Sequence, residues 1–83
     1  MKIIDVRTRG EYNCGHIEGA ILFDIMDMMY GKFPEFPKDE EILLYCESGS
    51  RAIIAKSMME QIGFTNVSNG GGIHDMINFG YKC

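Results

Sequence analysis

Short apolar runs alternate with helix-like stretches along the sequence, and this alternation limits the fold more than any other feature. Each run has the length of a buried strand. The candidates follow in the order strand 3–6, helix 9–14, strand 20–23, helix 24–30, strand 41–45, helix 52–62, strand 65–68 and helix 73–79. This order predicts an α/β fold, in which a small parallel sheet of about four strands lies between helices on both faces, in three layers.

Individual residues mark the ends of these elements. Thr8 and Glu11 match a capping box at the start of the first helix. Gly63 fits the position just after the long third helix, where a left-handed residue ends many helices. The glycine-rich run 69–72 is expected to be a turn between the last strand and the last helix.

The long third helix has an apolar side that predicts how it packs. Ile54, Met58 and Ile62 share one face at helical spacing, and Ala55 and Met59 lie beside them. We expect this face to cover the sheet.

Length and charge limit the classes of protein that the chain can represent. With 83 residues, we expect one domain, residues 1–83. Hydrophobic residues make up 46% and charged residues 24% of the chain, which is ordinary for a globular protein. Eight basic against twelve acidic residues give a formal net charge of −4, and the basic ones are scattered. Nucleic acid is therefore not an expected partner.

The sequence contains no membrane-spanning or export signal. No apolar run approaches the length that spans a bilayer, and Asp5 and Arg7 interrupt the first run before it reaches the length of a signal-peptide core. Three widely spaced cysteines do not make a disulfide framework, and we expect them to be thiols in a reducing compartment. These features predict a cytoplasmic protein with no membrane partner.

Cys46 lies where chemistry is most strongly indicated. It ends the apolar run 42–45 and opens the small polar segment 47–51, which leads into the long helix. A strand, a tight turn and a helix N-terminus therefore meet at one thiol. Backbone N–H groups and the positive end of the helix dipole favour an anion there, and they favour the thiolate form of a cysteine. Cys46 is the predicted catalytic nucleophile.

The polar segment after Cys46 supplies the candidate binding residues. Arg51, in the first helical turn, has the geometry to bind an anionic substrate bidentately. Ser48 and Ser50 add hydroxyl donors, and Gly49 permits a backbone conformation in which several amides converge. Glu47 is expected to repel a dianion at the rim by a modest amount that salt screens.

Other polar residues are weaker candidates. Asp5 and Arg7 follow a strand, where they either set the electrostatics of the pocket or pair with each other. Cys14 and His16 are two positions apart, but no second pair completes a tetrahedral metal site, so we expect them to be structural turn residues. The sequence predicts no metal and no cofactor.

Ordered short motifs across nearly the whole chain resemble those of single-domain rhodaneses. The matching pieces are Ile4-Asp5-Val6-Arg7, Glu11-Tyr12, Gly15-His16-Ile17, Gly19-Ala20, Leu44-Tyr45-Cys46 with Gly49 and Arg51, Gly63-Phe64-Thr65-Asn66-Val67 and Gly71-Gly72-Ile73. The resemblance implies a rhodanese-like fold and a sulfurtransferase. In that reaction Cys46 takes sulfane sulfur from an anionic donor such as thiosulfate, or from a protein persulfide, and passes it to a thiol or to cyanide.

The chain departs from the family pattern at two places. Met76 stands where the family usually has a tryptophan, which we interpret as a packing substitution. The chain also starts at the strand that holds Asp5 and lacks the usual first edge strand. An uncovered sheet edge can pair with another chain, so a homodimer through this edge is one expectation.

Two other functions stay open at this stage. A cysteine phosphatase of the related type has a longer loop between its Cys and Arg and a His before the Cys, whereas Tyr45 precedes Cys46 here. A non-catalytic module that carries sulfur or binds a partner protein is the second alternative. Cys83 is either a thiol that resolves a persulfide as a disulfide or an unpaired thiol.

Overall fold

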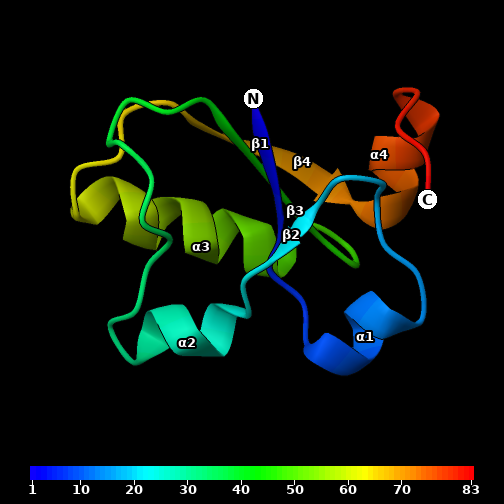
Figure 1. Cartoon of the computed structure of the whole chain (residues 1–83), viewed down its shortest axis with the longest axis horizontal. Coiled ribbons are helices and arrows are strands. Elements are labelled where there is room, and N and C mark those ends of the chain that lie inside the picture. Colours follow the sequence, from blue (N-terminus) through cyan, green and yellow to red (C-terminus); the bar gives the residue numbers. More distant parts are fainter.

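The computed structural model describes all 83 residues, and strands and helices alternate along it (Figure 1). The elements are β1 (Lys2–Asp5), α1 (Arg9–Asn13), β2 (Ile21–Leu22), α2 (Ile25–Met29), β3 (Ile42–Cys46), α3 (Ser50–Gln61), β4 (Val67–Gly72) and α4 (Ile73–Asn78). The predicted order of elements is confirmed, with small shifts at their ends. None of the helices combines the length and the apolar character needed to cross a membrane.

The four strands form one parallel sheet in the order β2-β1-β3-β4. From β1 the chain moves outward to β2, and it then crosses back to β3 and continues to β4. The direction of winding therefore reverses between β1 and β3. In open α/β sheets, ligands bind outside the carboxyl ends of the strands at such a reversal. The predicted α/β fold with about four parallel strands is confirmed.

The glycine-rich run after Ser68 was wrongly predicted as a turn, because it is the second half of β4. Asn69 pairs with Leu44 of β3, and Gly72 pairs with Cys46 after a local irregularity in the register. A side chain on Gly72 would overlap the backbone of Glu47. Glycine is needed there because two backbones approach closely, which the sequence pattern does not distinguish from a turn.

Helices α2 and α3 cover one face of the sheet, and the predicted side of α3 is right only in part: Ala55 and Met59 are buried as expected, but Ile54 and Ile62 are not. The buried residues of α3 are Ala52, Ala55 and Met59, whereas Ile54 and Ile62 are 46% and 39% exposed. The small alanines let the helix axis lie close to the strands, since the side chains at a contact set the distance between packed elements. The expectation that Ile54 and Ile62 face the sheet is therefore wrong.

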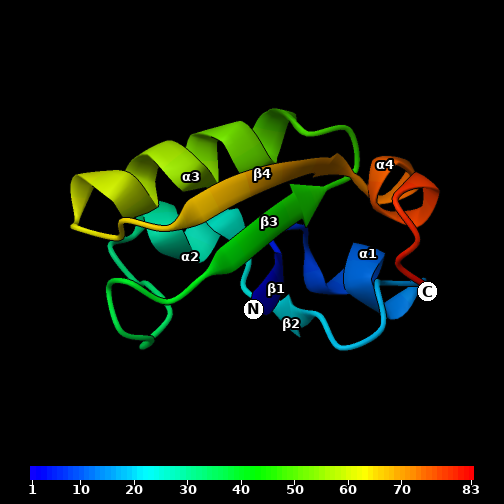
Figure 2. The same cartoon turned by 90° about the horizontal axis from the view of Figure 1, so that it is seen from above.

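The opposite face is covered by α4 and by the loop between α1 and β2. Its core cluster contains Ile17, Ala20, Tyr45, Ile73 and Met76. Figure 2 shows α1 and α4 at the end of the sheet toward which the strands point. Met76 is fully buried, in agreement with its predicted packing role. The predicted three-layer arrangement is thus confirmed, and the layer that α4 and this loop form is the smaller of the two outer layers.

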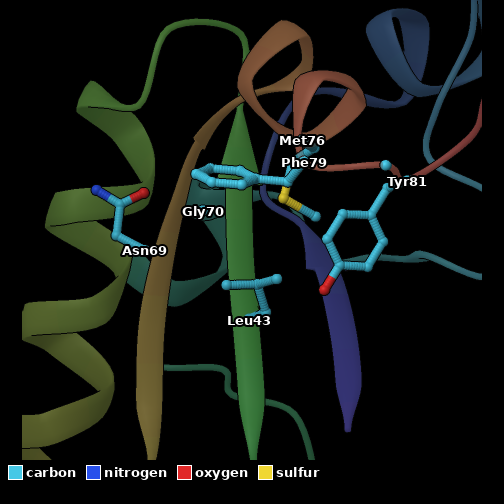
Figure 3. A pocket seen from close by; sticks show the side chains of 7 residues that line it. Leu43, Asn69, Gly70, Met76, Phe79 and Tyr81 are labelled. Atoms are coloured by element: carbon cyan, nitrogen blue, oxygen red, sulfur yellow. The ribbon is translucent and has the colours of Figure 1, made fainter.

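Part of this second face is open beside α4. Figure 3 shows Leu43 on β3 below Met76, Phe79 and Tyr81, with Gly70 of β4 at the side. Together they line most of a shallow hollow of about 530 Å³. Tyr81 is the only titratable residue in its lining, so this hollow offers apolar surface rather than reactive groups.

Candidate active site

Cys46 lies at the junction that the sequence predicts. It is the last residue of β3, and α3 begins at Ser50. The Cys46 Sγ accepts a hydrogen bond of 2.9 Å from the backbone N–H of Gly49. A donor N–H and the positive end of a twelve-residue helix thus face the sulfur, and both stabilise negative charge on it. The Cys46 side chain is fully buried.

The loop after Cys46 has a backbone that only glycine suits at its turn. Gly49 has φ of 99°, in the left-handed region, and a Cβ there would lie 3.3 Å from the Cα of Gly71. The hydroxyls of Ser48 and Ser50 lie 3.4 Å apart on the exposed side of the loop. Two predicted hydroxyl donors are therefore together at the rim.

Arg51 lies in the first turn of α3 as predicted, and it already has a partner. Its Nη1 and Nη2 donate to the two carboxylate oxygens of Glu11 over 2.7 and 2.8 Å. The bidentate pair lowers the pKa of Glu11 to about 2, and it raises the pKa of Arg51. Sequence reasoning missed this role of Glu11, which also caps α1. The two residues are forty positions apart, so no local pattern connects them.

Asp5 and Arg7 pair with each other, which is one of the two alternatives left open. The Asp5 carboxylate accepts from the backbone N–H of Arg7 at 2.9 Å and from its Nε and Nη2 at 3.0 and 2.8 Å. Both side chains are buried. These hydrogen bonds raise the pKa of Arg7 despite its burial. Arg7 also donates from Nη1 to Glu47 at 3.3 Å, so it connects the buried pair to the loop that follows Cys46.

Tyr45 completes this buried network, and sequence reasoning missed it. Its hydroxyl donates to Asp5 at 2.7 Å and accepts from the backbone N–H of Ile17 at 2.9 Å. Burial raises the pKa of Tyr45, which keeps the phenol protonated. Arg7 in turn donates to the carbonyl of Gly15 at 2.7 Å. The only signal in the sequence is a tyrosine inside an apolar strand, because a buried hydroxyl needs a partner.

A hollow of about 600 Å³ opens at the carboxyl ends of β1 and β3. Its lining consists of Arg7, Gly10, Glu11, Cys14, Gly15, Glu47, Ile73 and Cys83. No group of three His, Cys, Asp or Glu side chains is arranged to hold a metal ion. His16 stacks on Tyr12 with ring centroids 3.6 Å apart, which is a structural role.

The sequence also matches the model of a known protein family. The family model described as Rhodanese-like domain matches residues 1–76. The chain belongs to the rhodanese-like family. The resemblance that the ordered motifs indicate is therefore confirmed, and so is the rhodanese-like fold.

Similar proteins in this family include named sulfurtransferases. The chain is 32% identical over 76 residues to the thiosulfate sulfurtransferase PspE of Escherichia coli strain K12, and the match covers 88% of the chain and 71% of PspE. It is 35% identical over 72 residues to a sulfurtransferase of Allochromatium vinosum, covering 86% of the chain and 66% of that protein. The rhodanese-like family also extends to larger proteins. The chain is 31% identical to the tRNA uridine(34) hydroxylase of Chlamydia felis but spans 22% of it.

Solved rhodanese-like structures have the same fold. The rhodanese-like domain of the Alr3790 protein from Anabaena superposes with a TM-score of 0.86 at 30% identity, covering 99% of this chain and 95% of that domain. A rhodanese with anions from E. coli superposes with a TM-score of 0.76 at 30% identity, covering 89% and 88%. The similarity thus extends over nearly the whole chain.

Proposed function

We propose that the protein is a sulfurtransferase that carries sulfane sulfur as a persulfide on Cys46. The observation that carries this proposal is the hydrogen bond from the Gly49 N–H to the Cys46 Sγ at the N-terminus of α3. Both a thiolate and a persulfide are anions, and each is stabilised there without a metal. The sequence similarity to named sulfurtransferases supports the same reaction class.

The reaction has two displacement steps. The Cys46 thiolate attacks the sulfane sulfur of a donor, a new S–S bond forms, and the donor leaves with the electron pair as sulfite or as a thiolate. A nucleophilic acceptor, a thiol or cyanide, then attacks the outer sulfur and releases the Cys46 thiolate. Nucleophilic catalysis of this kind divides one difficult transfer into two easier ones.

The charges around the loop bear on the donor. Arg51 remains our candidate donor-binding residue, because its pairing with Glu11 leaves other N–H groups of the guanidinium unused. Glu47 is 54% exposed at the rim and adds negative charge. We propose that the donor is thiosulfate or a persulfide, with the persulfide of a thiol less affected by Glu47 than a dianion is.

Sulfur loading of Cys46 tests the proposal. The protein is incubated with thiosulfate or with a low-molecular-weight persulfide, and the Cys46 peptide is examined by mass spectrometry. We expect one added sulfur, which cyanide removes as thiocyanate, and no adduct at this position in Cys46→Ser. Absence of the adduct with both donors would overturn the proposed function.

Burial of Cys46 favours a second candidate, a non-catalytic module that carries sulfur or binds a partner protein. Such a module accepts sulfur once and does not turn over with a small acceptor. Steady-state thiocyanate formation separates the two functions. Several turnovers per Cys46 support the enzyme, whereas a single stoichiometric transfer supports the module.

We also propose that the protein works in a reducing compartment such as the cytoplasm. Cys14, Cys46 and Cys83 are all free thiols in the structure. Thiols persist where glutathione and thioredoxin keep them reduced.

A further inference from the structure

Two thiols from opposite ends of the sequence line the hollow beside the Cys46 loop. Cys14 and Cys83 are both exposed, and both belong to the lining of this hollow of about 600 Å³. Arg7 and Glu47 line it as well. No step of the proposed transfer uses either thiol.

The fold places Cys83 in this hollow. The carbonyl of Lys82 accepts a hydrogen bond of 2.6 Å from the backbone N–H of Glu18, in the loop after α1. The N–H of Tyr81 donates to the carbonyl of Met76 over 3.1 Å, and the Tyr81 ring packs against the second core cluster. The segment before Cys83 is thus held against the loop that follows Cys14.

Backbone hydrogen bonds also hold Cys14. Its N–H donates to the carbonyls of Gly10 and Glu11 over 3.2 and 3.1 Å, which makes it the C-terminal cap of α1. An exposed side chain on a fixed backbone faces the hollow. The fold therefore brings the two thiols to the lining of one hollow, although 68 residues separate them in the sequence.

The hollow adjoins the sulfur-carrying loop. Glu47, which lines the hollow, directly follows Cys46, and it is held there by Arg7 at 3.3 Å. Cys46 itself is buried and does not line the hollow. Glu47 is therefore the residue through which the hollow adjoins the Cys46 loop.

We propose that Cys83 and Cys14 form an internal dithiol acceptor that takes sulfane sulfur from Cys46 and releases it as sulfide. This inference rests on the proposed function, because it needs a persulfide on Cys46. It gives the protein a second activity, the reduction of sulfane sulfur to sulfide without an external acceptor.

The two steps balance in atoms and electrons. The Cys83 thiolate attacks the outer sulfur of the Cys46 persulfide, the S–S bond to Cys46 breaks, and its electron pair returns Cys46 to the thiolate. The Cys14 thiolate then attacks the inner sulfur of the Cys83 persulfide, which forms a Cys14–Cys83 disulfide and expels the outer sulfur as hydrosulfide. The sulfane sulfur is reduced and the two thiols are oxidised. A cellular thiol of the glutathione class then reduces the disulfide.

Single-turnover sulfide release tests this activity. The fully reduced protein, freed of reductant, is mixed with thiosulfate in the absence of any added thiol, and sulfide is measured from the moment of mixing. We expect nearly one sulfide per loaded Cys46, together with a Cys14–Cys83 disulfide in the peptides digested without reductant. Within one molecule, the effective concentration of the Cys83 thiol is on the order of mM. At about 10 µM protein, release within the molecule is therefore roughly a hundredfold faster than transfer between molecules.

Three variants assign the steps. Cys83→Ser is expected to retain sulfur on Cys46, and Cys14→Ser is expected to retain it on Cys83. The matched control is the triple variant Cys14→Ser, Cys83→Ser and Ser57→Cys, which moves a thiol to an exposed site on α3 outside the hollow. We expect this control to release sulfide no faster than a variant that carries only Cys14→Ser and Cys83→Ser.

The outcomes separate this inference from the proposed function. A wild-type protein that loads Cys46 but neither releases sulfide nor forms the disulfide overturns the dithiol alone. Equal release from the Ser57→Cys control also overturns it, since any exposed thiol would then suffice. Failure of Cys46 to load any sulfur overturns both proposals.

Discussion

Two arginine–carboxylate pairs flank the same end of the sheet, and they differ in burial. The pair of Arg7 with Asp5 is buried, and the Asp5 carboxylate also accepts from the Tyr45 hydroxyl. The pair of Arg51 with Glu11 is bidentate as well, but each side chain is 32% exposed. The same kind of ion pair therefore occurs once in the buried interior and once near the surface.

The difference shows which charges the fold needs and which remain available to a substrate. Removing one partner of a buried pair leaves an uncompensated charge away from water, which is strongly destabilising. A half-exposed pair contributes little to stability, because water and salt compensate either partner. The pair of Arg7 with Asp5 is thus needed for the stability of the fold. We interpret the pair of Arg51 with Glu11 as the one that a substrate can more easily displace.

The largest expected effect comes from breaking the buried pair. Asp5→Ala leaves Arg7 without its buried carboxylate and the Tyr45 hydroxyl without its acceptor, and we expect a loss of about 3–5 kcal/mol in the free energy of unfolding. Urea unfolding followed by circular dichroism measures it. Asp39→Ala, at an exposed position, is the control and is expected to stay within about 0.5 kcal/mol of wild type. Similar stability of both variants would show that the buried pair is not needed for the stability of the fold.

Tyr45→Phe is expected to have the next largest effect. It removes the hydroxyl that bridges Asp5 and the Ile17 N–H, and we expect a loss of about 1–3 kcal/mol because a buried donor loses its partner. Tyr30→Phe, at a tyrosine that is 80% exposed, is the matched control. A loss no larger than the control's would mean that water replaces the hydroxyl.

Glu11→Gln tests the half-exposed pair, and we expect a loss of only about 1 kcal/mol or less at neutral pH. The pKa of Glu11 falls from an ordinary 4.5 to about 2 in the fold. The carboxylate therefore stabilises the protein above pH 4.5, and this contribution is lost as the pH falls toward 2. Thermal unfolding from pH 7 to pH 2 should show a flatter decline in Glu11→Gln than in wild type and Glu41→Gln. Parallel curves for all three would contradict the assignment.

The smallest expected effect concerns the rim carboxylate. Glu47→Gln removes a negative charge that is 54% exposed, so the KM for thiosulfate is expected to fall by about twofold to threefold at low salt. Glu35→Gln, on the loop after α2, is the control. Equal KM values for the two variants at low ionic strength would eliminate repulsion by Glu47 as a factor in donor choice.

The sequence predicted what depends on local patterns. The order of strands and helices, the capping box at Thr8 and Glu11, and the placement of Cys46 before a helix all follow from periodicity and end signals over a few residues. The ordered motifs predicted the family correctly. Whether Cys46 and the residues of its loop transfer sulfur remains a prediction for the loading experiment.

What the sequence did not predict depends on tertiary proximity. Neither the pairing of Arg51 with Glu11 nor the hydrogen bond between Tyr45 and Asp5 can be recognised across forty residues of chain. The buried side of α3 was predicted only in part for the same reason: Ala55 and Met59 are buried as expected, but Ala52 completes the contact in place of Ile54 and Ile62.

The closeness of Gly49 to Gly71, and of Gly72 to the Glu47 backbone, has a consequence for how such a protein evolves. The loop and the neighbouring strand approach each other through main-chain atoms, so the position of the Cys46 sulfur depends mainly on the backbone. Positions 47, 48 and 50 can therefore change their chemistry while the reactive atom stays in place. A domain built this way can change the charge and polarity around this sulfur by single substitutions, without a new fold.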